Sequence, residues 1–166
     1  MKKITSLIFT IVFLILVSEC SGYKPIFASK NLQFNISEYS IEGNKILGNK
    51  IYSRLYNLSK SKKDDKNLRN INFIIEVSKE KKATVKNNAG KILEYKITLS
   101  SNVEVIDFIT EDKILNQVFI SSLTYKVQDK YSDTIDLENR AIENLLNKIY
   151  QELVTRLAQN IIITWS

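Results

Sequence analysis

The sequence predicts an α+β fold of the two-layer sandwich type, in which an antiparallel β-meander sheet of about four strands carries two helices on one face. Three observations predict it: alternating apolar and polar residues from residue 71 to 127, an apolar stripe at helical spacing before this region, and a longer stripe after it. The expected order is β-α-β-β-β-α. With 166 residues, 44% of them hydrophobic and 25% charged, the chain is sized for one globular domain, placed at residues 33–166.

The first strand and the first helix are expected between residues 33 and 58. Phe34 and Ile36 alternate with polar residues, which is typical of a short strand at 33–37. From residue 45 onward, apolar residues recur at intervals of four, four and three and draw one stripe along a helix. This stripe consists of Leu47, Ile51, Leu55 and Leu58. Residues 59–67 carry no apolar side chain and are expected to form a solvated loop.

Three longer strands are expected next, joined by tight connections into the antiparallel meander. The first pair is joined by a turn at residues 87–90, Asn-Asn-Ala-Gly. On the third strand, Val118 and Ile120 make the outer face less polar than on the other two. The inner faces are predicted to consist of Ile71, Phe73, Ile75, Val77, Ala83 and Val85 on the first strand, Leu93, Tyr95, Ile97, Leu99, Val103 and Val105 on the second, and Leu115, Phe119, Leu123, Tyr125 and Val127 on the third.

A long C-terminal helix is expected to cover the sheet. Asp133 is the predicted N-cap, and residues 135–163 contain neither glycine nor proline. A helix of about 28 residues would be ~42 Å long, more than the sheet needs, so the apolar last turns at 160–165 are expected to project, fray or meet a partner. The buried stripe is predicted to be Ile142, Leu145, Leu146, Ile149, Leu153 and Leu157.

The start of the chain has the layout of a signal peptide, predicted at residues 1–19. Lys2 and Lys3 precede an apolar run from residue 4 to 17. As a helix, this run would reach only ~21 Å, short of the ~30 Å hydrocarbon layer of a membrane. An uncleaved anchor that extends beyond Ser18 is the alternative.

Cys20, the only cysteine, follows the apolar run directly. A bacterial lipobox places its acylated cysteine there, since a thiol linked to diacylglycerol must lie at the membrane face. Cys20 is therefore the predicted lipid-attachment site, and residues 20–32, with the only proline at Pro25, are the predicted lipidated tether. The alternative is a thiol present in the leader by chance.

Composition argues against an enzyme. The chain contains no histidine, which removes His-based triads and imidazole metal sites. Neither a glycine-rich phosphate loop nor a Cys/His cluster is present, and we expect no cofactor and no metal site. The carboxylate pairs are predicted to be solvated surface groups; they are Asp64 with Asp65, Glu111 with Asp112, and Asp133 with Asp136.

Basic residues gather around the first hairpin. A positively charged hairpin can contact the phosphate groups of a glycolipid, because each ammonium group acts as a point charge toward an oxyanion. The alternative is a set of lysines that keep the sheet soluble and protect its edge. The candidate lipopolysaccharide-binding residues are Lys79, Lys81, Lys82, Lys86 and Lys91. The net charge of +6 would also suit nucleic acid, but the export signal disfavours that partner.

Cys20 is followed, after Ser21, by Gly-Tyr-Lys-Pro-Ile-Phe at residues 22–27. This segment resembles the start of the mature chain in the lipopolysaccharide-assembly lipoprotein LptE (RlpB) family, as does the order of one helix, a β-meander and a long helix. Weaker matches lie at Ala83, Gly90 and Tyr95, at residues 125–127 (Tyr-Lys-Val), and at Arg140 and Ala141.

The resemblance implies a lipoprotein, acylated with fatty chains such as palmitate, on the periplasmic face of the outer membrane. It implies a plug inside the LptD β-barrel translocon that assists assembly of the barrel and delivery of lipopolysaccharide to the outer leaflet. The expected partners are an LptD-type barrel, lipopolysaccharide and the membrane. The alternative function is a lipid-anchored periplasmic adaptor that binds another envelope protein and has no role in lipopolysaccharide transport.

Overall fold

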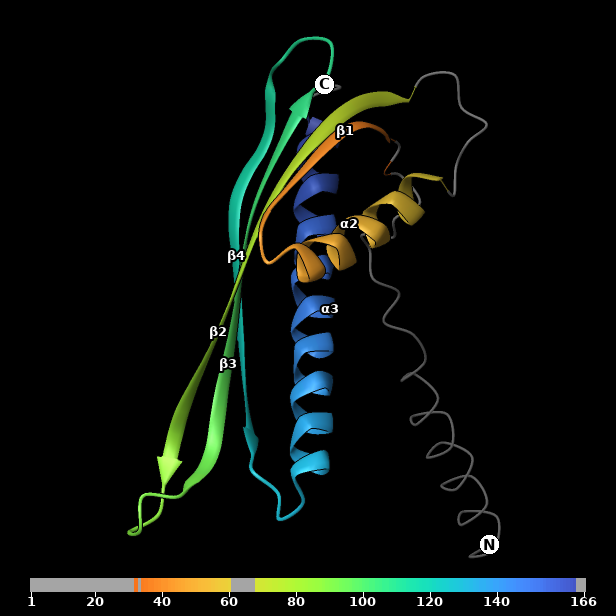
Figure 1. Cartoon of the computed structure of the whole chain (residues 1–166). Helices are drawn as coiled ribbons and strands as arrows, with labels where there is room; N and C mark the ends of the chain where they lie inside the picture. Colours follow the sequence, from red (N-terminus) through yellow and green to blue (C-terminus); the bar gives the residue numbers. More distant parts are fainter. Residues whose placement is uncertain (1–31, 33, 61–67, 164–166) are drawn as a thin grey trace, which may run out of the picture.

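The computed structural model describes residue 32, residues 34–60 and residues 68–163. The predicted signal peptide, Cys20, all but the last residue of the tether, and most of the predicted loop 59–67 lie outside this part of the chain. The predicted order of elements is confirmed (Figure 1): β1 (Phe34–Gly43), α2 (Lys45–Lys60), β2 (Arg69–Lys86), β3 (Ile92–Asp107), β4 (Lys113–Lys126) and α3 (Tyr131–Ile163).

The four strands form one sheet in the order β1-β2-β3-β4, and both helices lie on the same side of it (Figure 1). Strands β2, β3 and β4 form the predicted antiparallel meander. The prediction of a wholly antiparallel sheet is wrong, since β1 pairs with β2 in parallel. A parallel pair needs a crossover connection, and α2 supplies it by carrying the chain back before β2 begins.

The turn from β1 into α2 is built on Gly43 and Asn44. Gly43 has a φ of 68°, in the left-handed region that favours glycine. The backbone N–H of Asn44 donates a hydrogen bond of 2.7 Å to the carbonyl oxygen of Val77 on β2. The Asn44 side-chain oxygen accepts a hydrogen bond of 3.2 Å from the N–H of Leu47, which caps the helix. One short segment thus ends the strand, starts the helix and ties both to the neighbouring strand.

The core lies between the sheet and the two helices and follows the predicted apolar faces. Odd-numbered residues of β2, β3 and β4 alternate with more exposed ones along the middle of the sheet. Leu47, Ile51 and Leu55 of α2 are buried against them. All six residues of the predicted stripe on α3 are also buried. Ala83, Val85 and Leu93 are the exceptions: all three are exposed, Val85 by 43% and Leu93 by 40%, because they lie toward the tip of the β2–β3 hairpin.

Helix α3 begins at Tyr131, before the predicted N-cap, so the prediction for Asp133 is wrong. Thr134 stabilises the entry instead, since its hydroxyl oxygen accepts a hydrogen bond of 2.8 Å from the N–H of Gln128. Asp133 lies in the first turn, where a carboxylate interacts favourably with the helix dipole. With 33 residues the helix is ~50 Å long. Ile161 is buried in the core, so the last turn for which side chains are described does not project from the body.

Asp107 organises the loop between β3 and β4. Its carboxylate accepts hydrogen bonds from the backbone N–H groups of Thr110 (2.9 Å) and Ile109 (2.8 Å) and from the guanidinium group of Arg69. The hydrogen bond from Thr110 contributes most to lowering the pKa of Asp107 from 3.8 to about 2, and the bonds from Arg69 and Ile109 add to it. Burial opposes this shift. The nearby Glu111 and Asp112 are exposed, as the sequence predicts.

We expect this carboxylate to make stability depend on pH at the acid end. Because its pKa is lower in the folded state, its contribution is complete above about pH 4 and is lost as the pH falls toward 2. The shift corresponds to about 2 kcal/mol of unfolding free energy. Denaturant titrations of the wild type and of Asp107→Asn at a series of pH values from neutral down to about 2 measure it. The variant should be less stable near neutral pH and should lose less stability on acidification; parallel pH profiles would contradict the assignment.

Candidate functional site

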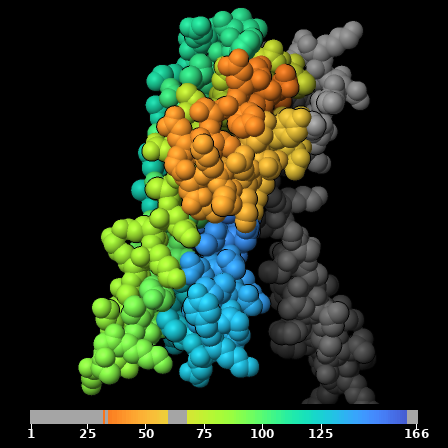
Figure 2. Space-filling model, in the orientation of Figure 1, coloured from red at the N-terminus to blue at the C-terminus, as the bar shows by residue number. Residues whose placement is uncertain are grey.

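The outer half of the β2–β3 hairpin, residues 79–96, is rich in lysine and is called here the distal hairpin. It contains six lysines and two glutamates. Figure 2 shows it projecting away from α2 at the lower left of the molecule. Every residue from Lys79 to Lys91 is exposed. The predicted basic hairpin is therefore a protruding surface rather than a pocket.

The turn of the distal hairpin is the predicted one at residues 87–90. The Asn87 side-chain oxygen accepts hydrogen bonds from the backbone N–H groups of Ala89 (3.0 Å) and Lys91 (2.9 Å). Gly90 has a φ of 80° and donates its N–H to the carbonyl oxygen of Asn87 at 2.9 Å. The pairing register shifts on both sides of Val85, which places bulges just before the turn. This local bonding holds the two cationic arms together at the tip.

Lys81 and Lys79 lie on the inner face and are occupied by the protein itself. The ammonium group of Lys81 lies 2.5 Å from the Glu138 carboxylate of α3, and that of Lys79 lies 4.0 Å from the same carboxylate. The hydroxyl of Tyr125 donates a further hydrogen bond of 2.9 Å to Glu138. Lys81 also lies over the ring of Tyr95, 4.3 Å from its centroid, in cation–π geometry. Two strands and a helix therefore meet at Glu138.

The pKa values of this cluster report mutual stabilisation. Burial alone would lower the pKa of Lys81, but hydrogen bonds to Glu138 and Tyr125 raise it above its usual value. Burial alone would raise the pKa of Glu138, but the hydrogen bond from Lys81 holds it below its usual value. Both groups therefore stay charged across the physiological pH range. Lys81 therefore links the distal hairpin to α3 through its ion pair with Glu138.

We expect Glu138→Gln to loosen the distal hairpin without unfolding the protein. The change removes the negative charge that Lys79 and Lys81 share, and partly exposed ion pairs contribute only modestly to global stability. Amide hydrogen exchange at residues 79–96 should speed up several-fold, because local opening no longer breaks a charged contact. Asp136→Asn, an equal charge change at an exposed position of the same helix, is the control. Equal exchange in both variants would mean that Glu138 does not hold the hairpin.

On the other face of the sheet lies a lysine that the sequence analysis missed. Lys96 of β3 is paired directly with Lys82 of β2, and like charges at this spacing repel each other. Lys82 is partly compensated by Glu80, at 2.7 Å. No ion pair involving Lys86, Lys91 or Lys96 occurs in the described part of the chain. The alternation that made Lys96 an outward-facing residue could have identified it.

The five predicted lysines therefore do not form one site. Lys79 and Lys81 face α3, Lys82 faces outward beside Lys96, and Lys86 and Lys91 flank the tip. The unpaired ammonium groups offer contacts for an anionic ligand on the outer face and at the tip.

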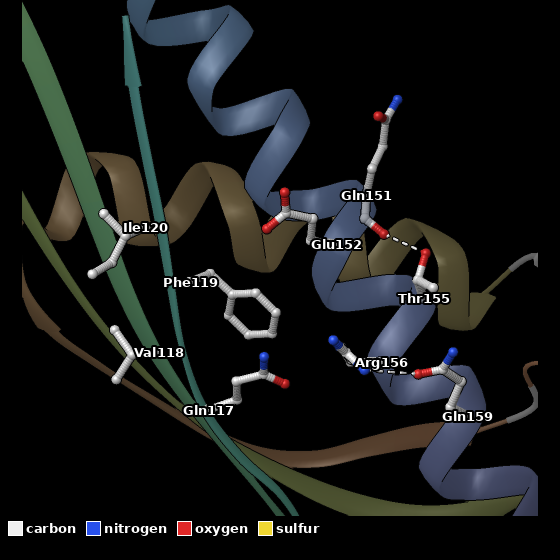
Figure 3. A pocket seen from close by; sticks show the side chains of 9 residues that line it. All are labelled: Gln117, Val118, Phe119, Ile120, Gln151, Glu152, Thr155, Arg156 and Gln159. Carbon is white, nitrogen blue, oxygen red and sulfur yellow. Dashed lines mark hydrogen bonds between the residues drawn. The ribbon is translucent and has the colours of Figure 1, made fainter.

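A shallow groove of about 430 Å³ lies between β4 and α3, far from the tip. Figure 3 shows the ring of Phe119 pointing toward α3 from β4, whereas Val118 and Ile120 point the other way. Polar groups line the helix side, where Thr155 donates to the Gln151 carbonyl oxygen and Arg156 donates to the Gln159 side chain. The whole lining is Gln117, Val118, Phe119, Ile120, Gln151, Glu152, Thr155, Arg156 and Gln159.

Within residues 32, 34–60 and 68–163, no group of three or more Cys, Asp or Glu side chains is arranged to hold a metal ion. A search of the same residues finds no helix with the length and hydropathy needed to span a membrane. Cys20, the predicted lipid-attachment site, lies outside them.

Comparison with known proteins gives a likeness of fold. No protein-family model and no curated protein sequence matches the chain. Among solved structures, a protein described as a lipoprotein of Caulobacter crescentus matches with a TM-score of 0.55 at 12% identity, covering 78% of this chain and 91% of that one. Lipoprotein B from Nitrosomonas europaea matches with a TM-score of 0.53 at 12% identity, covering 77% and 86%. The chain therefore shares its fold with solved bacterial lipoproteins.

Proposed function

We propose that this chain is an outer-membrane lipoprotein that plugs an LptD-type β-barrel, assists its assembly and takes part in lipopolysaccharide transport to the outer leaflet. One observation carries the proposal: a fold shared with two solved lipoproteins follows a signal-like leader that ends at a single cysteine. The LptE-like segment at residues 22–27 supports the choice of family. In this function the chain binds and positions other molecules and catalyses no reaction.

The outer face of the sheet supports the role of a plug. Its central positions carry mainly uncharged polar side chains, such as Ser78, Thr98, Ser100, Asn102 and Ser122. The lumen of an outer-membrane barrel is polar, so a mainly polar face is suited to fill it; Glu76, opposite Asn102, is a charged residue at its centre. Most apolar residues of the sheet are meanwhile used by the protein's own core, although Val118 and Ile120 are exposed on this face of β4. The polar outer face of the sheet would then serve as the interface with the barrel.

The distal hairpin supports contact with lipopolysaccharide, whose phosphate groups are strong anionic acceptors. Lys82, Lys86, Lys91 and Lys96 present ammonium groups away from the helices or at the tip, whereas Lys79 and Lys81 are held by Glu138. We therefore assign the ligand contact to the first four lysines and a structural role to the other two.

Co-purification with the barrel tests the function. A C-terminally tagged chain is extracted from outer membranes in mild detergent, and the eluted proteins are identified and quantified. A large β-barrel recovered at equal stoichiometry is the expected result. Recovery of a different envelope protein at equal stoichiometry would instead favour the periplasmic adaptor, and recovery without any barrel would contradict the proposal.

Charge reversal in the hairpin tests the ligand contact. Exchanging Lys86, Lys91 and Lys96 together for Glu should weaken lipopolysaccharide binding about tenfold at low salt, since each exposed contact contributes about 0.5 kcal/mol. The difference should shrink as salt screens the charges. The control exchanges Lys45, Lys130 and Lys148, which are exposed elsewhere, for Glu. If both triple variants bind alike, the hairpin lysines serve solubility.

A further inference from the structure

The loop between β3 and β4 carries two adjacent apolar side chains on its surface. Phe108 is 49% exposed and Ile109 is 77% exposed. In the described part of the chain, no other two consecutive large apolar residues are both exposed, and Ile109 is the most exposed large aliphatic residue. The loop is short, since β3 ends at Asp107 and β4 begins at Lys113. It therefore presents a small apolar tip at one end of the sheet.

The backbone N–H groups of this loop are bonded within the protein. The N–H of Phe108 donates to the carbonyl oxygen of Asn70 at 2.9 Å. The next three N–H groups, those of residues 109–111, all donate to oxygens of Asp107, at 2.8, 2.9 and 3.1 Å. A segment that enters a lipid interface must satisfy its N–H groups internally, because lipid offers few hydrogen-bond partners. This loop meets that condition.

The loop lies at the end of the sheet where β1 begins, opposite to the turn of the distal hairpin (Figure 1). Phe34, the first residue of β1, pairs with Arg69, the first residue of β2. The Arg69 guanidinium group is in turn ion-paired with Asp107 at the base of the loop. Leu32 and Phe34 are almost completely buried, so the chain is fixed to the body of the domain at this end.

The predicted lipid anchor can bring a membrane to this end of the sheet. Cys20 precedes Leu32 by twelve residues, and twelve residues of fully extended chain reach at most ~43 Å. The 18 residues of β2 place the turn of the distal hairpin ~60 Å from this end. Cys20 can therefore lie beside the β3–β4 loop, but it cannot reach the turn of the distal hairpin.

The charges beside the apolar tip determine which type of membrane it fits. Glu111 and Asp112 are exposed next to the tip, whereas the following Lys113 is ion-paired with Glu104 at 2.7 Å. The loop is therefore acidic, and anionic lipid head groups would repel it. A zwitterionic phospholipid surface carries no net charge and accepts the tip without this repulsion. The lysines of the distal hairpin would have the opposite preference, for anionic lipid.

We propose that Phe108 and Ile109 insert into the head-group region of the zwitterionic leaflet that holds Cys20 and form a second point of membrane contact beside the lipid anchor. An aromatic ring and an aliphatic side chain are residue types that bury themselves at such interfaces. With both contacts at one end of the sheet, the distal hairpin points away from this leaflet. The inference rests on the lipid attachment that is part of the proposed function, but it does not depend on the β-barrel.

A fluorescent label at residue 109 tests the insertion. Because acylation occupies the thiol of Cys20, the only cysteine, Ile109→Cys provides a unique site for a polarity-sensitive dye. Ile46→Cys is the matched control, since Ile46 on α2 is 74% exposed. Each lipidated full chain is placed in phosphatidylcholine vesicles with a quencher on the acyl chains. The label at 109 should shift to the blue and be quenched, because the tip lies about 5–10 Å deep, and the label at 46 should show neither change.

Three results of this experiment would overturn the proposal. Equal quenching of the two labels would show that residue 109 is not inserted. A blue shift at 109 without quenching would assign the tip to a contact between copies of the chain. Stronger quenching after addition of phosphatidylglycerol, an anionic lipid, would mean that lysines bring the chain to the membrane. Dye uptake by the wild type would reveal a free Cys20 and so remove the anchor itself, a failure that is distinct from failure of the tip.

Substitution of the tip gives an independent test through the orientation of the sheet. A dye on Ala89→Cys, at the turn of the distal hairpin, reports its distance from an acceptor dye on the lipid head groups by energy transfer. Phe108→Ser combined with Ile109→Ser should increase the transfer, because a chain held by the tether alone can tilt toward the membrane. Ile46→Ser, an equally exposed position on α2, should leave it unchanged. Equal transfer in all three chains would contradict the second contact.

Discussion

Replacement of Gly43 by alanine is expected to lower the free energy of unfolding by about 3 kcal/mol, a large effect for a single methyl group. A Cβ at this position would overlap the carbonyl oxygen of Val77. That oxygen accepts the hydrogen bond from Asn44, so a backbone shift that relieves the overlap also strains the start of α2. The left-handed φ of 68° adds about 1 kcal/mol for any residue with a Cβ.

Gly90→Ala is the matched control for this prediction. Gly90 also has a left-handed φ, 80°, but a Cβ there would meet no atom within 4 Å. Its replacement should cost only about 1 kcal/mol. Chemical denaturation of both variants measures the difference. Equal costs would show that backbone conformation, rather than the close approach of β1 and β2, determines the need for glycine at residue 43.

Replacement of Cys20 by alanine is expected to remove the protein from the outer membrane entirely. Without the thiol no diacylglycerol can be attached, and cleavage before residue 20 by the lipoprotein pathway should fail with it. Several fatty chains anchor a protein stably, so their loss removes the proposed anchor. The variant should lack the fatty chains and keep residues 1–19, and membrane fractionation together with mass measurement detects both changes.

Ser21→Ala, next to the proposed attachment site, is the control and should fractionate like the wild type. Unchanged mass and unchanged outer-membrane location of the Cys20→Ala chain would remove the lipoprotein assignment. The chain would then share the fold of the solved lipoproteins but would not be anchored by a lipid at Cys20.

Periodicity was sufficient to predict most of the fold. In β2 and β3 the apolar residues occupy odd positions over a long stretch, and each strand buries that face against the helices. The apolar stripes on α2 and α3 were predicted equally well, since burial of one side of a helix requires apolar residues at helical spacing. These features are local, because the spacing of apolar residues within each helix or strand shows which of its faces is buried.

Features that depend on distant residues were not predictable in this way. The parallel pairing of β1 follows from how α2 returns the chain, and β1 has little alternation because most of its residues are exposed at the edge. The role of Lys81 depends on Glu138, 57 residues away in the chain. Alternation alone puts Lys96 on the outer face, but its position opposite Lys82 follows only from the register of β2 with β3. In each case the missing information was which segments lie side by side.

The central claim, that Cys20 carries the fatty chains of a mature lipoprotein, is tested most directly by the intact mass of the protein extracted from membranes. We predict a chain that begins at Cys20, lacks residues 1–19, and is heavier than its amino-acid sequence by the mass of diacylglycerol and a further acyl chain. An unmodified polypeptide recovered from the soluble fraction would contradict the claim.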